Sequence, residues 1–187
     1  IDVLINNAGM HLGGPIEEAP AELFTRTMNT NFNGLVHIVQ AVLPHMRHNG
    51  GGTIINFSSI GGLMGLPFQG FYSAAKFAIE GFSEALRMEV KAFNIKIVVI
   101  NPGDFHTSNT ANRINIFTEG GPYEKQFKKS IDIIAKDETG GGEPVVLARK
   151  ICQIVDMKNP RQRYIISTME QKLAVVLKRI LPGKLFA

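Results

Sequence analysis

Residues 53–76 read TIINFSSIGGLMGLPFQGFYSAAK, a stretch in which a strand, a loop and the start of a helix follow one another. The apolar run 53–58 is short enough for a buried strand, and Ser59 follows it directly. Tyr72 and Lys76 are four residues apart on the predicted helix, so their side chains share one face. The stretch therefore predicts a strand-to-helix unit with polar groups around the connecting loop.

Strand and helix patterns alternate along the rest of the chain. Short apolar runs predict strands at 1–5, 53–58, 95–100 and 164–166, and apolar residues at helical spacing predict helices at 20–48, 71–92, 122–136, 144–157 and 169–181. Such alternation is typical of a parallel sheet with helices on both faces. The predicted fold class is α/β, a doubly wound parallel sheet, and 187 residues fit a single domain, 1–187.

The composition is that of an ordinary globular protein, with 44% hydrophobic and 19% charged residues. No apolar run is long enough for a transmembrane helix. The single cysteine, Cys152, cannot form an internal disulfide, which favours a reducing, cytoplasmic location. The net charge of +4 is too mild to indicate a nucleic-acid partner.

Polar clusters follow three of the predicted strands, at 6–9, 58–59 and 101–107. In parallel α/β sheets the carboxyl ends of the strands lie at one edge, and ligands bind there. We therefore expect the three clusters to form one site.

The pair Tyr72 and Lys76 suits acid–base chemistry. A tyrosine hydroxyl has a reference pKa of about 10, and it works best near neutral pH when that pKa is lowered. A nearby ammonium group lowers it, and Ser59 could hydrogen-bond the substrate oxygen. An isolated Y-x-x-x-K, however, is more often a half-buried aromatic residue beside a surface lysine, so further residues must decide.

Five motifs occur in one order: N-N-A-G at 6–9, N-F-N-G at 31–34, Ser59 thirteen residues before Tyr72, Y-S-A-A-K at 72–76, and P-G-D-F-H-T at 102–107. In this order they resemble the motifs of the short-chain dehydrogenase/reductase family, which implies a Rossmann-type sheet. The motifs support the resemblance from residue 1 to about 110, and it extends more loosely to about 166. The resemblance rests on the occurrence of all five motifs together in this order, since each motif alone is weak.

The resemblance implies a role for each matching residue. Tyr72 would exchange a proton with the substrate, Lys76 would lower the pKa of Tyr72 and bind the nicotinamide ribose, and Ser59 would orient the substrate. Asn31 would sit at a helix kink and hold a water that links Lys76 to solvent. The implied catalytic residues are Asn31, Ser59, Tyr72 and Lys76. Residues implied to bind NAD or NADP are Asn7, Ala8, Gly9, Tyr72, Lys76, Pro102, Gly103 and Thr107. No metal site is expected, because His37, His45 and His48 lack a tight ligand spacing.

The implied reaction is hydride transfer between NAD(P) and a secondary alcohol or ketone. The apolar loop 61–68 resembles that of hydroxysteroid and retinol dehydrogenases, which favours a lipophilic small molecule, although the loop could equally serve packing alone. Residues 108–143 would form a substrate lid. Two alternatives stay open: a non-catalytic protein that senses a dinucleotide, and a dehydratase or epimerase on the same scaffold.

The family's first three strands and its T-G-x-x-x-G-x-G turn have no counterpart in residues 1–187. We therefore expect these residues to be the C-terminal part of a longer protein, with 1–5 left as an open, apolar sheet edge. The residues that distinguish NAD from NADP would lie in the missing part.

Two helical regions indicate partners. Apolar residues on 20–48 and 71–92 exceed what one sheet face can cover, which together with the resemblance predicts a homodimer or homotetramer. These residues are Val36, Val39, Phe71, Phe77, Phe82 and Leu86. The segment 168–187 is predicted to be a basic C-terminal helix with a stripe of apolar residues. This stripe could rest on a membrane surface or, as we favour, pack on protein. The stripe comprises Met169, Leu173, Val176, Leu177 and Ile180.

Overall fold

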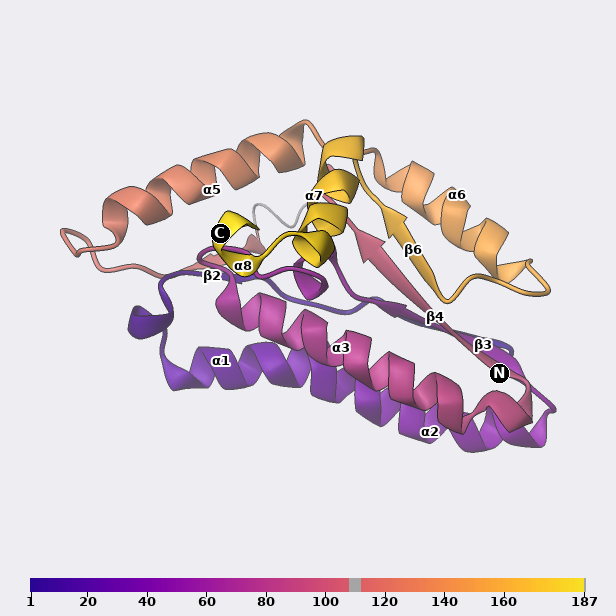
Figure 1. The fold of residues 1–187 in the computed structure, drawn as a ribbon. Coiled ribbons are helices and arrows are strands. Elements are labelled where there is room, and N and C mark those ends of the chain that lie inside the picture. Colours follow the sequence, from indigo (N-terminus) through magenta and orange to yellow (C-terminus); the bar gives the residue numbers. More distant parts are fainter. Residues whose placement is uncertain (108–111, 187) are drawn as a thin grey trace.

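The computed structural model describes residues 1–107 and 112–186, and its main sheet has four parallel strands (Figure 1). Their order across the sheet is β1 (Val3–Asn6), β3 (Gly52–Phe57), β4 (Ile95–Pro102) and β6 (Arg163–Ile166). Ile54 lies opposite Leu4 on one side and Ile97 on the other. The predicted parallel sheet is confirmed.

The predicted helices are present, with small changes at their ends. Residues 21–48 form α1 (Ala21–Met28) and α2 (Gly34–His48), joined by a π-helical turn at Asn29–Asn33. The later helices are α3 (Gly70–Glu89), α5 (Glu124–Thr139), α6 (Pro144–Val155), α7 (Met169–Ile180) and α8 (Gly183–Phe186). The sequence patterns do not predict α8, β2 (Leu12–Gly13) or β5 (Ile114–Asn115), which are too short to show a period.

Helices cover both faces of the sheet, as a doubly wound fold requires. Side chains alternate along β3 and β4, so that Ile54 and Ile97 face one core while Ile55 and Val98 face another. The first core contains α2 and α3 residues: Leu35, Val39, Met46, Ile79 and Leu86. The second contains Ile154 of α6, with Leu147 and Ile151 packed against it.

The strand β1 is less buried than its apolar sequence predicts. Among the described residues it pairs with β3 alone and forms one edge of the sheet. Ile5 is 46% exposed for this reason. The open, apolar edge expected at 1–5 is thus present among the described residues.

The helices α2 and α3 bury more of their apolar residues than the sequence suggests. Val39 and Leu86 lie in the core, and Phe82 packs against it. Val39 and Leu86 are therefore not available to an interface between copies, whereas Phe82 is only partly buried. The apolar residues that remain exposed on the two helices are Ile38, Phe77 and Met88.

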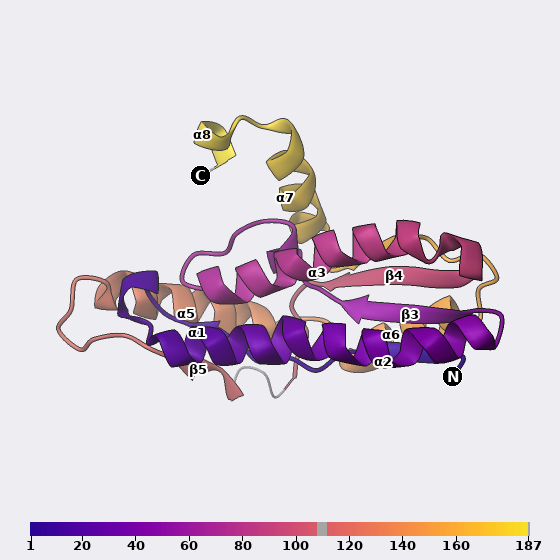
Figure 2. The same cartoon turned by 90° about the horizontal axis from the view of Figure 1, so that it is seen from below.

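The residues of α7 that pack on the protein are not those of its predicted apolar stripe. Figure 2 shows α7 and α8 standing away from the sheet and its helices. Val175 is buried against Ile60 and Met64, and the small residue Ala174 packs beside it. Most of the expected stripe is exposed, at Met169, Leu173, Val176 and Ile180. Within residues 1–107 and 112–186, no helix is both long and apolar enough to cross a membrane.

Gly62 lets the loop after β3 pass close to α3. A Cβ atom built there would lie 2.3 Å from the Ser58 hydroxyl oxygen and 2.9 Å from the Lys76 carbonyl oxygen. At Gly65, three residues further on, such an atom would have no neighbour within 4 Å. The close approach at Gly62 fixes the distance between the end of β3 and the helix.

Gly62→Ala should lower the free energy of unfolding by about 1–3 kcal/mol, the usual cost of overpacking, because the loop or α3 must move. Gly65→Ala is the matched control and should be neutral or slightly stabilising, since alanine restricts the unfolded chain. Urea unfolding followed by circular dichroism measures both. Equal midpoints for the two variants would contradict the close approach.

Candidate active site

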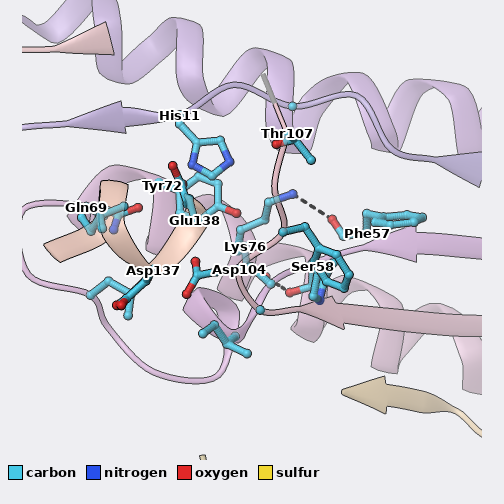
Figure 3. A pocket seen from close by; sticks show the side chains of 18 of the residues that line it. His11, Phe57, Ser58, Gln69, Tyr72, Lys76, Asp104, Thr107, Asp137 and Glu138 are labelled. Atoms are coloured by element: carbon cyan, nitrogen blue, oxygen red, sulfur yellow. Dashed lines mark hydrogen bonds between the residues drawn. The ribbon is translucent and has the colours of Figure 1, made fainter. Parts of the chain in front are cut away.

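A cavity of about 660 Å³ lies at the carboxyl ends of the strands (Figure 3). All three predicted polar clusters contribute to its lining. Asn7, Ala8 and Gly9 come from the first cluster, Ser58 and Ser59 from the second, and Pro102, Gly103 and Thr107 from the third. Tyr72 and Lys76 enter from α3. The single site expected at this edge is therefore present.

The hydroxyl of Ser59 lies close to that of Tyr72, and its hydrogen-bonding influence lowers the pKa of the phenol. The Ser59 oxygen also accepts a bond of 3.0 Å from the Gly61 amide, and Asn101 donates from its side chain to the Ser59 carbonyl at 2.9 Å. Ser58 points elsewhere, since its hydroxyl donates to the Lys76 carbonyl at 3.2 Å. Ser59, at the expected spacing, is thus the serine that faces the phenol.

Lys76 is only 5% exposed, and its ammonium donates a 2.8 Å hydrogen bond to the Phe57 carbonyl. The same nitrogen lies 5.7 Å from the centre of the Tyr72 ring. Burial lowers the pKa of Lys76 to about 8, although Glu80 opposes this shift. The lysine is therefore close to the tyrosine and easily neutralised.

The electrostatics of Tyr72 differ from the expectation that Lys76 lowers its pKa. Burial raises the pKa of Tyr72 to about 12, and the hydrogen bond from Ser59 and the charge of Arg113 offset this only in part. The Lys76 ammonium is directed at the Phe57 carbonyl rather than at the phenol oxygen. In this state the phenol is protonated at neutral pH.

Asn31 lies in the π-helical turn, as expected for a kink, but its side chain binds backbone rather than lining the cavity. Its oxygen accepts a 2.7 Å bond from the Met10 amide, and its nitrogen donates at 2.9 Å to the Met10 carbonyl. The carboxamide is therefore committed to Met10, and its contribution is to hold the loop after β1. The expectation that Asn31 holds a water for Lys76 stays a prediction.

The loop around Gly9 leaves room for a ligand to approach closely. A Cβ atom at Gly9 would stand 3.5 Å from the Asn31 side-chain oxygen and 3.8 Å from the Lys76 nitrogen. A side chain there would therefore cover the lysine. The residues on this side of the cavity fit the ribose and carboxamide of a nicotinamide, which offer hydroxyl and amide groups to the Lys76 ammonium and the backbone.

The motifs do not identify His11, which is central to the site. Its ring stacks on that of Tyr72 with the ring centres 4.2 Å apart. Burial lowers the pKa of His11 to about 3, and the charges of Arg113 and Lys76 add to this effect. The imidazole is thus neutral and supports the phenol. Its place two residues after N-N-A-G is the signal that could have indicated it.

The predicted lid contributes charged groups, although 108–111 lie outside the described residues. Arg113 and Glu138 form a buried ion pair in the cavity wall. Asp104 and Asp137 also line the cavity, and burial raises the pKa of Asp104, although a hydrogen bond from Gln171 opposes this shift. No group of three metal-binding side chains occurs in the part of the chain that the structure describes.

Comparison with known proteins identifies the family. Residues 1–115 match the family described as short chain dehydrogenase. A protein of Bacteroides thetaiotaomicron named 3-ketodihydrosphingosine reductase is 49% identical over 187 residues, an alignment that covers 99% of this chain and 70% of that protein. The chain belongs to the short-chain dehydrogenase family.

Solved structures agree with this assignment. A short-chain dehydrogenase from Streptomyces avermitilis gives a TM-score of 0.82 at 28% identity, covering 96% of this chain and 65% of that one. A closed serine dehydrogenase with bound NADP+ gives a TM-score of 0.75 at 25% identity, covering 91% and 66%. The chain thus spans about two thirds of the length of these solved proteins.

The buried histidine makes stability depend on acidity. Because the pKa of His11 falls from 6.5 to about 3 on folding, the unfolded chain binds an extra proton between these values, and stability is lost as pH falls. His11→Phe keeps an aromatic ring on Tyr72 without a titrating group. Between pH 7 and pH 4 the wild type should lose roughly 3 kcal/mol more stability than this variant.

The control for this experiment is His48→Phe, at the exposed end of α2, which should lose stability like the wild type. Urea unfolding at a series of pH values measures all three proteins. The same pH slope for His11→Phe and wild type would show that His11 is not held neutral.

Proposed function

We propose that this protein is an NAD(P)-dependent dehydrogenase that reduces a lipophilic ketone to a secondary alcohol. The observation that carries the proposal is the paired hydroxyls of Ser59 and Tyr72 in the cavity, with Lys76 one turn further along α3. The dinucleotide cofactor of the NADP+-bound serine dehydrogenase supports the choice of cofactor.

A reduced nicotinamide, when bound, supplies the hydride. The Ser59 hydroxyl donates a hydrogen bond to the substrate carbonyl and holds it against the phenol. Tyr72 then gives its hydroxyl proton to the same oxygen as negative charge develops there. The Lys76 ammonium, one turn further along the same helix, is directed at the Phe57 carbonyl in this state and would bind the nicotinamide ribose.

The direction of the reaction is argued from the protonation of Tyr72. With a pKa of about 12, the phenol carries its proton at neutral pH and acts as an acid. Reduction needs an acid, whereas oxidation of an alcohol needs the phenolate. The reduced nicotinamide ring is uncharged, so it does not lower the pKa of Tyr72. The phenol therefore still carries its proton when the substrate binds. The site in this state therefore supports the reductive direction.

The cofactor would be held at its nicotinamide end by the residues that the motifs indicate. The Lys76 ammonium suits the ribose hydroxyls, and the glycine at position 9 allows the backbone of 7–9 to approach. Pro102, Gly103 and Thr107 would border the ring on the opposite side of the cavity. These assignments rest on the cavity lining and on the family motifs.

The substrate proposal rests on two observations. Met64 and Leu66 of the apolar loop line the cavity, where they could contact an apolar substrate. The Bacteroides relative, at 49% identity, is named for a long-chain ketone, 3-ketodihydrosphingosine. A ketone with a long apolar chain is therefore the substrate class we propose.

Tyr72→Phe should reduce kcat by a factor of at least about 100, because general acid catalysis contributes about 10²–10⁴. The matched control is Tyr164→Phe on β6, which removes a hydroxyl outside the cavity and should keep full activity. Loss of nicotinamide absorbance with a panel of ketones measures turnover. A Tyr72→Phe enzyme with about a tenth or more of wild-type kcat would overturn the assignment, since that loss is below the range for general acid catalysis.

The same assay separates the alternative functions. A wild-type protein that binds NAD(P)H but oxidises none of it with any ketone would favour a sensing role. Conversion of substrate with no net change in nicotinamide absorbance would favour a dehydratase or epimerase.

For the assembly we propose a homodimer or homotetramer formed through the outer faces of α2 and α3. The apolar residues Ile38, Phe77 and Met88 are exposed there, and two such helix pairs can form a four-helix bundle. Ile38→Lys with Phe77→Lys should therefore reduce the mass seen by light scattering to that of one chain. Val145→Lys, an equally exposed site on α6, is the control. An unchanged mass in the double variant would exclude this interface.

A further inference from the structure

A second cavity, of about 400 Å³, lies against the first. It is formed by the loop after β3 and by α5, and its lining residues are Leu66, Pro67, Gln69, Gln126, Lys129, Ser130, Ile133 and Ile134. Leu66, Gln69 and Ile134 line both cavities. The two cavities therefore share a wall, and that wall is made mainly of flexible aliphatic side chains.

The two cavities differ in chemical character. The first holds the hydroxyl pair and the charged groups of the catalytic site. The lining of the second is largely aliphatic, at Leu66, Pro67, Ile133 and Ile134, and it opens to solvent where Gln126, Lys129 and Ile133 are exposed on α5. A molecule that occupied both cavities would have its polar end at Tyr72 and its apolar end beside α5.

We propose that the second cavity binds the alkyl chain of the ketone whose carbonyl lies at Tyr72. This inference rests on the proposed function and adds where the chain lies and which residues select it. The position of the second cavity beside the catalytic one favours this occupant over a second copy of the protein, because Leu66, Gln69 and Ile134 line both cavities. The volume is within the range of small-molecule sites.

The position of Ile133 makes it the residue with which to test the proposal. It lines the second cavity but not the first, and it is 51% exposed on α5, so a larger side chain can enter the cavity without disturbing the core. Val146 on α6 is 54% exposed and lines neither cavity. Ile133→Trp and Val146→Trp are therefore a matched pair.

The measurement is kcat/KM for a series of straight-chain methyl ketones from butanone to dodecanone. In the wild type, kcat/KM should rise about fourfold for each methylene that enters the cavity, as expected for hydrophobic burial. In Ile133→Trp the ratio of kcat/KM for dodecanone to that for butanone should fall at least about 16-fold, the equivalent of two buried methylenes. In Val146→Trp the ratio should equal that of the wild type.

Several outcomes would overturn the inference while NAD(P)-dependent ketone reduction itself stands. One is ketone reduction that does not depend on chain length, and another is the same ratio in Ile133→Trp as in the wild type. A lower mass by light scattering for Ile133→Trp with an unchanged ratio would assign the cavity to a second copy instead.

A binding measurement separates failure of this inference from failure of the proposed function. If no ketone is reduced, the proposed function fails. Calorimetry with dodecan-2-ol then tests the cavity directly. Binding by the wild type and Val146→Trp that is lost in Ile133→Trp would support the alkyl-chain site, and equal binding by all three, or none, would reject it.

Discussion

The hydrogen bond from the Lys76 ammonium to the Phe57 carbonyl is the constraint on which the site depends. A buried charge is costly unless it is hydrogen-bonded, so α3 cannot slide along β3 without leaving that charge unpaired. The bond from Ser58 to the Lys76 carbonyl fixes the same turn of the helix from the other side. Tyr72 lies one turn earlier on this helix and is therefore positioned by contacts that it does not itself make.

Burial dominates the electrostatics around that turn. Tyr72, Lys76 and His11 are all shifted toward their uncharged forms, and the largest cause of each pKa shift is desolvation. The ion pair of Arg113 with Glu138 lies in the wall of the same cavity. The result is a site in which the phenol keeps its proton at neutral pH.

The sequence was sufficient for the sheet, the long helices and the edge that carries the site, because these depend on local periodicity and on the order of strands and helices. It was also sufficient for Ser59 rather than Ser58, since spacing decides which hydroxyl meets Tyr72. It could not indicate Arg113, Glu138 or the exposed face of α7, because these depend on how segments distant in sequence pack together. Nor could it indicate the raised pKa of Tyr72, which depends on the depth of burial rather than on the neighbouring lysine.

The double hydrogen bond between Asn31 and Met10 couples the length of a helix to the shape of the loop that carries His11. Each residue inserted into an α-helix rotates the residues after it by about 100°. An insertion between 21 and 30 would therefore turn the Asn31 carboxamide away from Met10, whereas one in the glycine turn at 50–51 would leave that register intact. Natural or engineered insertions are thus tolerated after α2, at 50–51, and excluded in and just after α1, at 21–30.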